Sequence, residues 1–310
     1  MAETRKNEAP GNRPDEDAGV KRGRLSVVAT PIGNLGDLSP RAVEVLQTAD
    51  LIAAEDTRVT MKLCQVFSIH ARLVSVHRHN EGEKSGLLAS RIAAEGLNAA
   101  LVTDAGTPCI SDPGHELVAA CLAEGVEVIA VPGCCAAVAA ISVSGFDARE
   151  FAFYGFLPRE RKPLREKLRE IGRGVRVAAV HESPYRIIEL TEAIAETLPE
   201  ARLTVCCDLT KLHEKTLYGT PDQVLSALRA NEKTEKGEYC VILDLHQVPE
   251  EEGEHAAPVL SPEGRLAELL VQGLSPREAQ DALVAEGVRK NAAKQAMLNL
   301  RRLFENGEDA

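Results

Sequence analysis

The stretch Leu101-Val102-Thr103-Asp104-Ala105-Gly106-Thr107-Pro108, followed closely by Ser111-Asp112-Pro113-Gly114, decides how this chain folds. An apolar run that ends in Asp-Ala-Gly-Thr-Pro is typical of a buried strand that stops abruptly, because Gly106 frees the backbone and a proline cannot continue a ladder of hydrogen bonds. The loop is therefore expected at the carboxyl end of a strand, where ligands bind in open α/β sheets. Asp104 either offers its carboxylate to a ligand or only caps a tight turn.

Strand-like and helix-like segments alternate on both sides of this stretch. Short apolar runs predict strands at 25–29, 51–54, 72–76, 99–103 and 126–131. The segments between them predict helices at 39–48, 57–67, 84–95 and 114–124. Such alternation is typical of a parallel sheet covered by helices. Three strand-end loops, at 30–38, 104–114 and 132–137, are expected to line one crevice, and their small residues leave room for a ligand.

The character of the sequence changes near Gly145. An aromatic stretch, Phe151 to Pro158, is followed by a helical stretch rich in Arg and Lys, Arg159 to Arg176. That basic segment either contacts a nucleic acid or is simply a solvated helix face. Further strands are predicted at 175–181, 202–207, 215–219 and 239–245, and helices at 186–196 and 221–229. Because some of these connections are hairpin-like, the pattern favours a mixed sheet.

The composition divides the chain into five parts. We expect a disordered arm at 1–24, an N-terminal α/β domain at 25–145, a C-terminal α/β domain at 146–246, an acidic linker at 247–260 and a helical accessory domain at 261–310. The last part carries Arg289, Lys290 and Lys294. It either contacts nucleic acid or caps a neighbouring domain or subunit.

Bulk properties exclude several classes of protein. With 310 residues, 44% of them hydrophobic, the chain can bury the cores of two domains. No apolar run reaches the roughly 18 residues that span a bilayer, and the start lacks the apolar segment of a signal peptide, so a cytoplasmic protein without membrane contact is expected. The eight cysteines contain no Cys-x-x-Cys and are expected to be reduced core thiols. A net charge of −11 argues against indiscriminate nucleic-acid binding.

Five separated motifs carry a resemblance to a known family. They are Thr30-Pro31-Ile32-Gly33-Asn34-Leu35, Ala54-Glu55-Asp56-Thr57-Arg58, His77-Arg78-His79-Asn80-Glu81, the Asp104 to Gly114 stretch, and Pro132-Gly133. Together they closely resemble the ribosomal RNA small subunit methyltransferase I family of the tetrapyrrole methylase superfamily. Four further motifs extend the likeness through the second domain: Tyr154 to Pro158, Glu182 to Pro184, Leu209 to Lys211, and Lys236 to Glu238.

The resemblance implies a fold and an activity. The fold is α/β and tetrapyrrole-methylase-like: a parallel-sheet domain plus a mixed-sheet domain, with a small helical C-terminal extension. The activity is S-adenosyl-L-methionine (AdoMet)-dependent 2′-O-methylation of a cytidine in the decoding region of 16S ribosomal RNA, within the small ribosomal subunit, by a homodimer. Two alternatives stay open: a small-molecule methyltransferase of the same fold, of corrin or diphthine type, and a non-catalytic ribosome-assembly factor.

The resemblance also implies the site residues, in a cleft between the two domains. Cofactor contacts are expected from Ile32, Gly33, Asp104, Gly106, Thr107, Pro108, Cys134, Cys135, Ala136, Val180, Cys206 and Glu238. Substrate contacts are expected from Arg58, His77, Arg78, Asn80 and Lys211. Of these, Arg58 and Arg78 are expected to bind phosphate, because guanidinium groups suit its geometry. No metal is expected, since His77-x-His79 lacks further ligands at suitable spacing.

A ribose 2′-hydroxyl is a poor nucleophile while it keeps its proton, so a positioned proton acceptor should help the reaction. The candidates are His79, Glu81, Glu182 and Asp208. We favour the first two, because they lie with an amide and another imidazole in one strand-end loop; the alternative for the histidine pair is a surface or capping role. The chain departs from the family pattern at Cys134, His181, Tyr185 and Cys207-Asp208, where Pro, an aromatic residue, His and Arg-Glu are usual.

Overall fold

The computed structural model describes residues 23–78, 80–248 and 261–305. Residues 1–22 of the expected arm and residues 249–260 of the expected linker lie outside this range. The chain divides into two compact units, Met1–Pro249 and Glu250–Ala310. Each unit is described by itself.

The first sheet has five strands in the order β3-β2-β4-β1-β5, and all neighbouring strands run parallel. The strands are β1 (Arg24–Val28), β2 (Leu51–Ala54), β3 (Arg72–Ser75), β4 (Asn98–Val102) and β5 (Glu127–Val131). The prediction of a parallel sheet is confirmed, and each strand lies within two residues of its predicted bounds.

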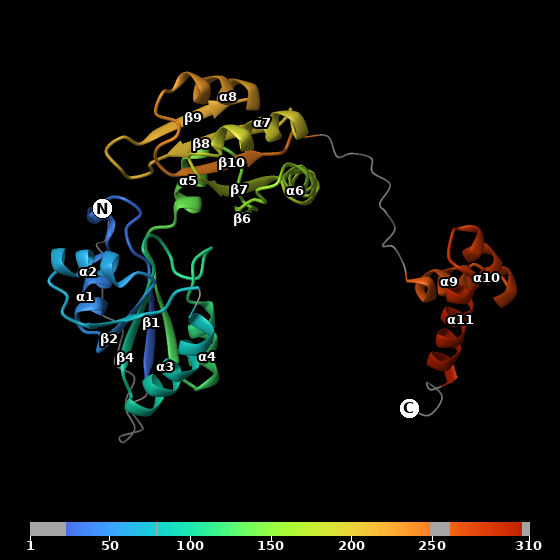
Figure 1. Cartoon of the computed structure of the whole chain (residues 1–310), viewed down its shortest axis with the longest axis horizontal. Helices are drawn as coiled ribbons and strands as arrows, with labels where there is room; N and C mark the ends of the chain where they lie inside the picture. Colours follow the sequence, from blue (N-terminus) through green and yellow to red (C-terminus); the bar gives the residue numbers. More distant parts are fainter. Residues whose placement is uncertain (1–22, 79, 249–260, 306–310) are drawn as a thin grey trace, which may run out of the picture. The chain divides into compact units, whose positions relative to one another are not determined.

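Helices cover both faces of this sheet (Figure 1). They are α1 (Pro40–Gln47), α2 (Thr57–Val66), α3 (Glu81–Glu95) and α4 (His115–Ala123). Residues of α1 and α2 pack on one face and residues of α3 and α4 on the other. The first helix begins where the sequence indicates, because the Ser39 side chain accepts the N–H of Ala42 and Pro40 occupies the first helical turn. Helix α3 begins three residues earlier than predicted. The sequence placed its start too late because Gly82 and Gly86 weaken the helical pattern there.

The strand order creates a crevice at the carboxyl edge of the sheet. From β1 the chain passes to β2, on the far side of β4, whereas from β4 it passes to β5, on the far side of β1. Because the two connections leave neighbouring strands in opposite directions, a gap opens above β1 and β4. The loops 29–34 and 103–114 border that gap.

The second sheet is mixed, as predicted, with the order β6-β7-β10-β8-β9. Strands β6 and β7 are parallel, and the other neighbouring pairs are antiparallel. Its strands are β6 (Ala152–Phe156), β7 (Val177–Glu182), β8 (Arg202–Cys207), β9 (Lys215–Gly219) and β10 (Tyr239–Asp244). This order brings the end of β7, the end of β8 and the start of β10 to one edge.

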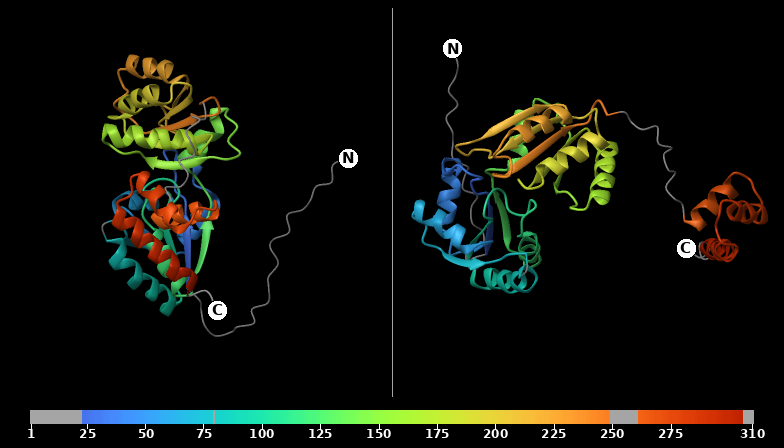
Figure 2. Two further views of the ribbon diagram at one scale, coloured as in Figure 1. Left: turned by 90° about the vertical axis from the view of Figure 1, so that its right-hand side faces the viewer. Right: turned by 45° about the horizontal axis from the view of Figure 1, so that its top comes forward.

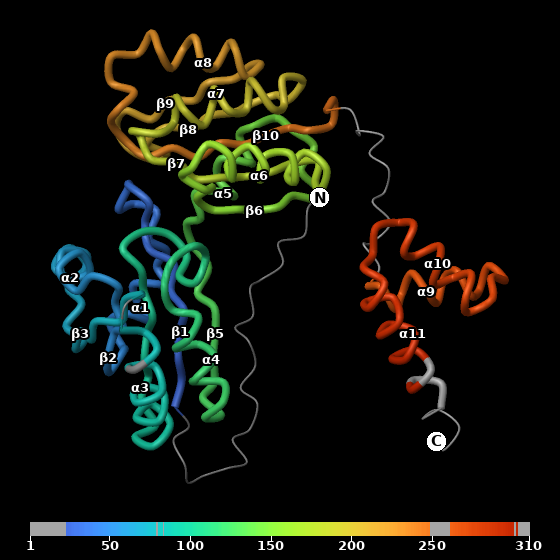
Figure 3. Tube along the Cα trace, turned by 45° about the vertical axis from the view of Figure 1, so that its right-hand side comes forward, coloured from blue at the N-terminus to red at the C-terminus, as the bar shows by residue number. Residues whose placement is uncertain are grey.

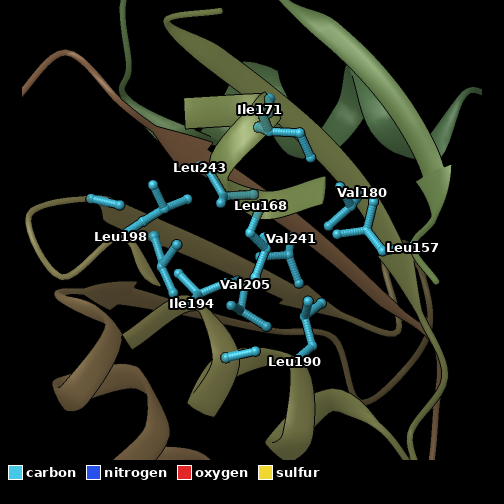
Figure 4. Close-up of a cluster of buried hydrophobic side chains, with 14 of the residues drawn as sticks. Leu157, Leu168, Ile171, Val180, Leu190, Ile194, Leu198, Val205, Val241 and Leu243 are labelled. Atoms are coloured by element: carbon cyan, nitrogen blue, oxygen red, sulfur yellow. The ribbon is translucent and has the colours of Figure 1, made fainter. Parts of the chain in front are cut away.

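Four helices belong to the second sheet: α5 (Ala136–Ser144), α6 (Arg161–Gly174), α7 (Ile187–Thr197) and α8 (Pro221–Ala230). Figure 4 shows the main core, in which Leu168 of α6 and Leu190 of α7 pack against strand residues such as Val241. Helix α5 covers the opposite face. Val248 packs against the main core, so the folded part extends two residues past position 246.

The second unit contains three helices, α9 (Pro262–Val271), α10 (Pro276–Ala285) and α11 (Lys290–Glu305), drawn in red in Figures 2 and 3. Leu266, Leu283 and Met297 lie in its small core. Ser275 and Glu278 form a capping box that starts α10. The predicted helical extension is confirmed. Within the described part of the chain, no helix has the length and apolar character needed to cross a membrane.

Candidate active site

A cavity of about 400 Å³ lies where the two sheets meet, within the size range of small-molecule sites. The first domain contributes the loops that follow β1, β4 and β5, and the second contributes the ends of β6, β7 and β8 and the start of β10. Its lining consists of Ile32, Ala105, Gly106, Thr107, Ile110, Ser111, Asp112, Cys135, Ala136, Phe156, His181, Glu182, Ser183, Pro184, Leu209, Glu238, Tyr239 and Cys240.

The three loops of the first domain are tied to one another. Thr30 and Gly106 exchange main-chain hydrogen bonds of 2.8 and 3.1 Å. The Thr107 hydroxyl donates to the carbonyl oxygen of Cys134 at 2.9 Å. The loops therefore form one rigid wall, as their shared position at strand ends predicted.

Gly106 needs to be glycine for two reasons. Its φ of +80° lies in the left-handed region, which side chains with a Cβ rarely adopt. A Cβ built there would lie 3.5 Å from Ile32 Cγ2 and 3.7 Å from the carbonyl oxygen of Cys134. Since Gly106 lines the cavity, the space that the missing side chain leaves is available to a ligand.

Glu182, at the end of β7, is the buried acid of the cavity wall. Its Oε1 accepts the N–H of Ser183 at 2.8 Å, while Oε2 has no hydrogen-bond partner and lies 3.4 Å from the guanidinium of Arg186. Burial raises the pKa of this carboxyl, against the lowering effects of the Ser183 N–H and of Arg186. A carboxyl in a cavity wall, with a raised pKa and one oxygen that accepts no hydrogen bond, is suited to accept a proton.

Asp112 stands on the opposite wall, in the loop after β4. Partial burial and the charges of Glu55 and Asp104 raise its pKa to about 6, although Arg78 opposes the shift. Main-chain N–H groups hold two of these acids in place: that of Asp56 donates to Oδ1 of Asp104 at 3.1 Å, and that of Asp104 donates to Oε2 of Glu55 at 3.5 Å. No group of three or more His, Cys, Asp or Glu in the described ranges is arranged to hold a metal ion.

A second set of contacts joins the two domains beside the cavity. The N–H of Asn34 donates to the Thr210 hydroxyl at 3.1 Å. A Cβ at Gly33 would lie 2.6 Å from Lys211 Cγ, so the two loops touch. The Lys211 ammonium bridges Asp208 at 3.0 Å and Glu238 at 2.9 Å.

The segment 77–81 holds the loop after β4 in place. Glu81 is 3% exposed, and its Oε1 accepts the N–H groups of Gly114 and Glu116, both at 2.8 Å. The Arg78 guanidinium donates to the carbonyl oxygen of Ser111 at 3.2 Å. Glu81 thus caps the N-terminus of α4 and does not line the cavity. His79, the other favoured proton acceptor, lies outside the described residues.

The remaining candidates for substrate binding make local contacts. Asn80 accepts the N–H of His77 at 2.9 Å and lies 3.0 Å from its imidazole. Arg58 is largely exposed and binds Asp56, and that bond lowers the pKa of the aspartate to about 2. None of the four side chains Arg58, His77, Arg78 and Asn80 lines the cavity.

The expected cofactor residues divide into three groups. Ile32, Gly106, Thr107, Cys135, Ala136 and Glu238 line the cavity. Gly33, Asp104, Pro108 and Cys134 lie in the same loops but do not line it. Val180 and Cys206 differ from the expectation: both are fully buried in the two cores of the second domain, because their positions on β7 and β8 turn the side chains into the sheet's packed faces.

Sequence reasoning did not select several cavity residues as site residues, above all Asp112, Phe156, His181 and Tyr239. Asp112 belongs to the Ser111 to Gly114 motif, so the sequence did contain a signal that could have identified it as a site residue. In the sequence, His181 is marked only as a departure from the family pattern, which usually has an aromatic residue there. The other two are aromatic residues whose direction depends on the pairing of β6 and β10.

Comparison with known proteins places this geometry in a family. The family model for tetrapyrrole (corrin/porphyrin) methylases matches residues 24–224. The chain is 41% identical over 281 residues to the ribosomal RNA small subunit methyltransferase I of Escherichia coli O157:H7, covering 89% of this chain and 95% of that protein. It is 42% identical over 265 residues to the protein of that name from Synechocystis sp., covering 85% and 93%.

Solved structures agree on the fold. A uroporphyrin-III C-methyltransferase from Thermus thermophilus, complexed with S-adenyl homocysteine, matches with a TM-score of 0.50 and 18% identity over 72% of this chain and 97% of that one. A diphthine synthase matches with a TM-score of 0.54 and 16% identity over 71% and 89%. With a two-domain fold, a cavity between the domains and close relatives over most of its length, the chain belongs to the ribosomal RNA small subunit methyltransferase I family of the tetrapyrrole methylases.

Proposed function

We propose that this chain is an AdoMet-dependent methyltransferase that modifies the 2′-hydroxyl of a cytidine in the decoding region of 16S ribosomal RNA. The observation that carries the proposal is the cavity between the domains, which joins small-residue loops suited to a cofactor with a buried carboxyl suited to a proton. The names of the relatives support small-subunit ribosomal RNA as the substrate.

The residues around the cavity fit AdoMet. Gly106 leaves a place where a Cβ would stand, beside Ile32 and the main chain of Cys134. Thr107, Cys135 and Ala136 line the same wall, so the cofactor would rest on the first domain's loops. When bound, AdoMet supplies a methyl group activated by its sulfonium, so the chain has to align the acceptor and receive its proton.

Glu182 is the proton acceptor that this proposal favours. It lines the cavity, it is buried, and one oxygen has no hydrogen-bond partner. Glu81 already accepts two main-chain N–H groups, and Asp208 is engaged by Lys211. Arg186 stabilises the Glu182 carboxylate before it takes the proton, while burial keeps its pKa high enough to receive it.

RNA contacts in this proposal come from basic residues outside the cavity. Lys162 and Arg169 of α6 are exposed and have no ion-pair partner among the described residues, unlike Lys167, which pairs with Glu170. Lys290 and Lys294 of α11 are likewise exposed and unpaired within the described ranges. Because the net charge is −11, binding should depend on such local patches and on an assembled subunit more than on naked RNA.

The proposal is tested with labelled AdoMet and small ribosomal subunits that lack the modification. Digestion of the RNA and mass spectrometry identify the methylated nucleoside, and we expect 2′-O-methylcytidine. Tight AdoMet binding without transfer to RNA would favour a small-molecule methyltransferase. Absence of AdoMet binding would favour a non-catalytic assembly factor. Equal methylation of subunits and naked RNA at matched salt would contradict the preference for the subunit.

We further propose that the protein acts as a homodimer in the bacterial cytoplasm, where its substrate is assembled. Tyr218 of β9, an edge strand, is exposed and donates to the carbonyl oxygen of Val143, whose side chain is exposed too. These side chains form an apolar surface that a second copy would cover. Light scattering should give twice the chain mass, and Tyr218→Glu should reduce it to one. A monomeric mass for the wild-type protein would contradict the dimer.

A further inference from the structure

Phe156 is an aromatic side chain that lines the cavity and yet stays exposed. It is the last residue of β6, and 64% of its surface is accessible. A phenylalanine gains about 1.5–3 kcal/mol when it is buried, so exposure in a cavity needs a reason. Apolar surfaces of this kind mark places where a partner binds.

The backbone of β6 turns Phe156 toward the cavity through a bulge. The pairing of β6 with β7 shifts between Phe153 and Gly155, so one extra residue enters the strand. In a regular strand, residues three apart face opposite sides of the sheet. The bulge instead puts Phe153 and Phe156 on one side, where both rings contact His181.

Gly155 makes this bulge possible. Its φ is +61°, in the left-handed region, and a Cβ there would lie 2.5 Å from the hydroxyl oxygen of Ser111. Only a glycine fits such a contact with the wall of the first domain. The strand is therefore shaped to bring Phe156 beside the loop that contains Ser111 and Asp112.

The imidazole of His181 packs against the exposed ring of Phe156. His181 pairs with Phe156 across the two strands, and the ring centroids lie 5.9 Å apart. On its other side, the Phe153 ring meets the imidazole edge-to-face at 5.0 Å. Burial lowers the pKa of His181, which favours the neutral imidazole. The planes of the Phe153 and Phe156 rings lie at 73° and 47° to the imidazole, and we call this cluster of three rings the platform.

We propose that the platform of Phe153, His181 and Phe156 is the site on which the base of the target nucleotide stacks, with the outer face of Phe156 in contact with the base. An unpaired base in RNA is recognised by stacking on aromatic side chains, and every base has such a face. Ser111 and Asp112 offer oxygen atoms for the edge of the base. This inference rests on the proposed function and assigns the base a place within it.

An exposed cation beside the cavity wall fits the same occupant. Arg78 is exposed, and its guanidinium donates to the carbonyl oxygen of Ser111, a residue of the cavity wall. A nucleotide on the platform would therefore have a flanking phosphate within reach of this guanidinium group. A purely apolar ligand would gain nothing from this charge.

The test compares Phe156→Ala, Phe156→Leu and Phe156→Tyr with the wild-type full chain. The matched control is Phe151→Ala, because Phe151 is also exposed, at 45%, and lies just before the same strand but outside the cavity. Two quantities are measured: AdoMet affinity by equilibrium dialysis, and kcat/KM for unmodified small subunits at saturating AdoMet. Thermal melting checks that each variant folds.

We expect kcat/KM for the subunit to fall about 10- to 100-fold in Phe156→Ala, as loss of one base stack implies, with AdoMet affinity unchanged. Phe156→Leu should behave like the alanine variant, because leucine lacks an aromatic face. Phe156→Tyr and the control should retain wild-type values.

Three outcomes would overturn the inference: an unchanged kcat/KM in Phe156→Ala, full activity in Phe156→Leu, or a parallel loss of AdoMet affinity, which would assign the ring to the cofactor. In each of these the wild-type protein still transfers methyl groups, so the proposed function survives. Absence of transfer by the wild-type protein would overturn both.

Discussion

Oε1 of Glu81 lies 2.8 Å from the main-chain nitrogen of Gly114, 33 residues away in the sequence, and accepts its N–H inside the first domain. The same oxygen accepts the N–H of Glu116 at the same distance. One buried carboxylate therefore fixes the start of α4 and the end of the loop that lines the cavity with Ile110, Ser111 and Asp112. A helix N-terminus favours a negative charge, so the arrangement is stabilising.

Replacing Glu81 by alanine should lower the free energy of unfolding by about 2–4 kcal/mol, because two buried N–H groups lose a charged acceptor. Urea unfolding measures this loss. Glu81→Gln should lose less, since an amide oxygen still accepts a hydrogen bond. The control is Glu116→Ala, which removes an exposed carboxylate and keeps the main-chain N–H. A small change in both Glu81 variants would argue against the capping role.

Gly106→Ala should damage the cofactor site more than the fold. The left-handed φ costs an alanine about 1–2 kcal/mol, and its methyl group would enter the cavity. Gly125→Ala is the matched control, because Gly125 has a φ of +71° and a Cβ there would meet nothing within 4 Å. Both variants should lose similar stability in thermal melts, whereas only Gly106→Ala should weaken AdoMet binding in calorimetry. Equal AdoMet affinities would contradict the assignment of the cavity.

Glu182→Gln should reduce kcat by about 10²- to 10⁴-fold, the usual contribution of a positioned base. Only the ionised carboxyl can accept a proton, and burial raises the pKa of Glu182. In the wild-type protein, activity should therefore fall as the pH drops through that raised value. The pH profile of kcat, measured with unmodified subunits, should lose this acidic limb in the variant. If the limb persists, another group accepts the proton.

Asp112→Asn should become more stable relative to the wild-type protein as the pH rises. The native carboxyl has a pKa raised to about 6 from the ordinary value of 3.8, so ionisation above that range costs free energy only in the folded state. As the pH falls below 3.8, the carboxyl becomes protonated in both states and the difference vanishes. Allowing for solvent screening of a partly exposed group, we expect about 1 kcal/mol between pH 4 and 7. Urea unfolding at both pH values would detect it, and a difference independent of pH would refute it.

Local patterns were sufficient for the elements and for the loops of the site. Alternating apolar strands and amphipathic helices predicted both sheets, because a buried strand or helix face requires apolar residues at a regular spacing along the sequence. Ser39-Pro40 and Ser275-Pro276 marked helix starts, since capping is a contact within one turn. The Asp104 to Gly114 stretch and the Thr30 loop were expected at one edge, and both border the cavity.

The direction of single side chains depended on contacts between segments far apart in the sequence. Glu81 was expected to accept a proton at the site. Instead, the loop after β4 folds back against it, and the main-chain N–H groups of Gly114 and Glu116 both donate to its carboxylate. Val180 and Glu182 stand two residues apart on β7, but only the second, at the strand end, lines the cavity. Neither outcome is encoded by local periodicity.

The sequence by itself determined the two sheets, the helical extension and the set of strand-end loops that meet at one edge, because each follows from hydrophobic periodicity and turn chemistry within a few residues. Only the tertiary structure decided which side chains enter the cavity. The bulge at Gly155 depends on the pairing of β6 with β7 and on contact with Ser111. The direction of Phe156 is therefore set by three segments that are far apart in the sequence: β6, β7 and the loop after β4. Pairing register and packing between domains are long-range properties, and they select the residues of the site.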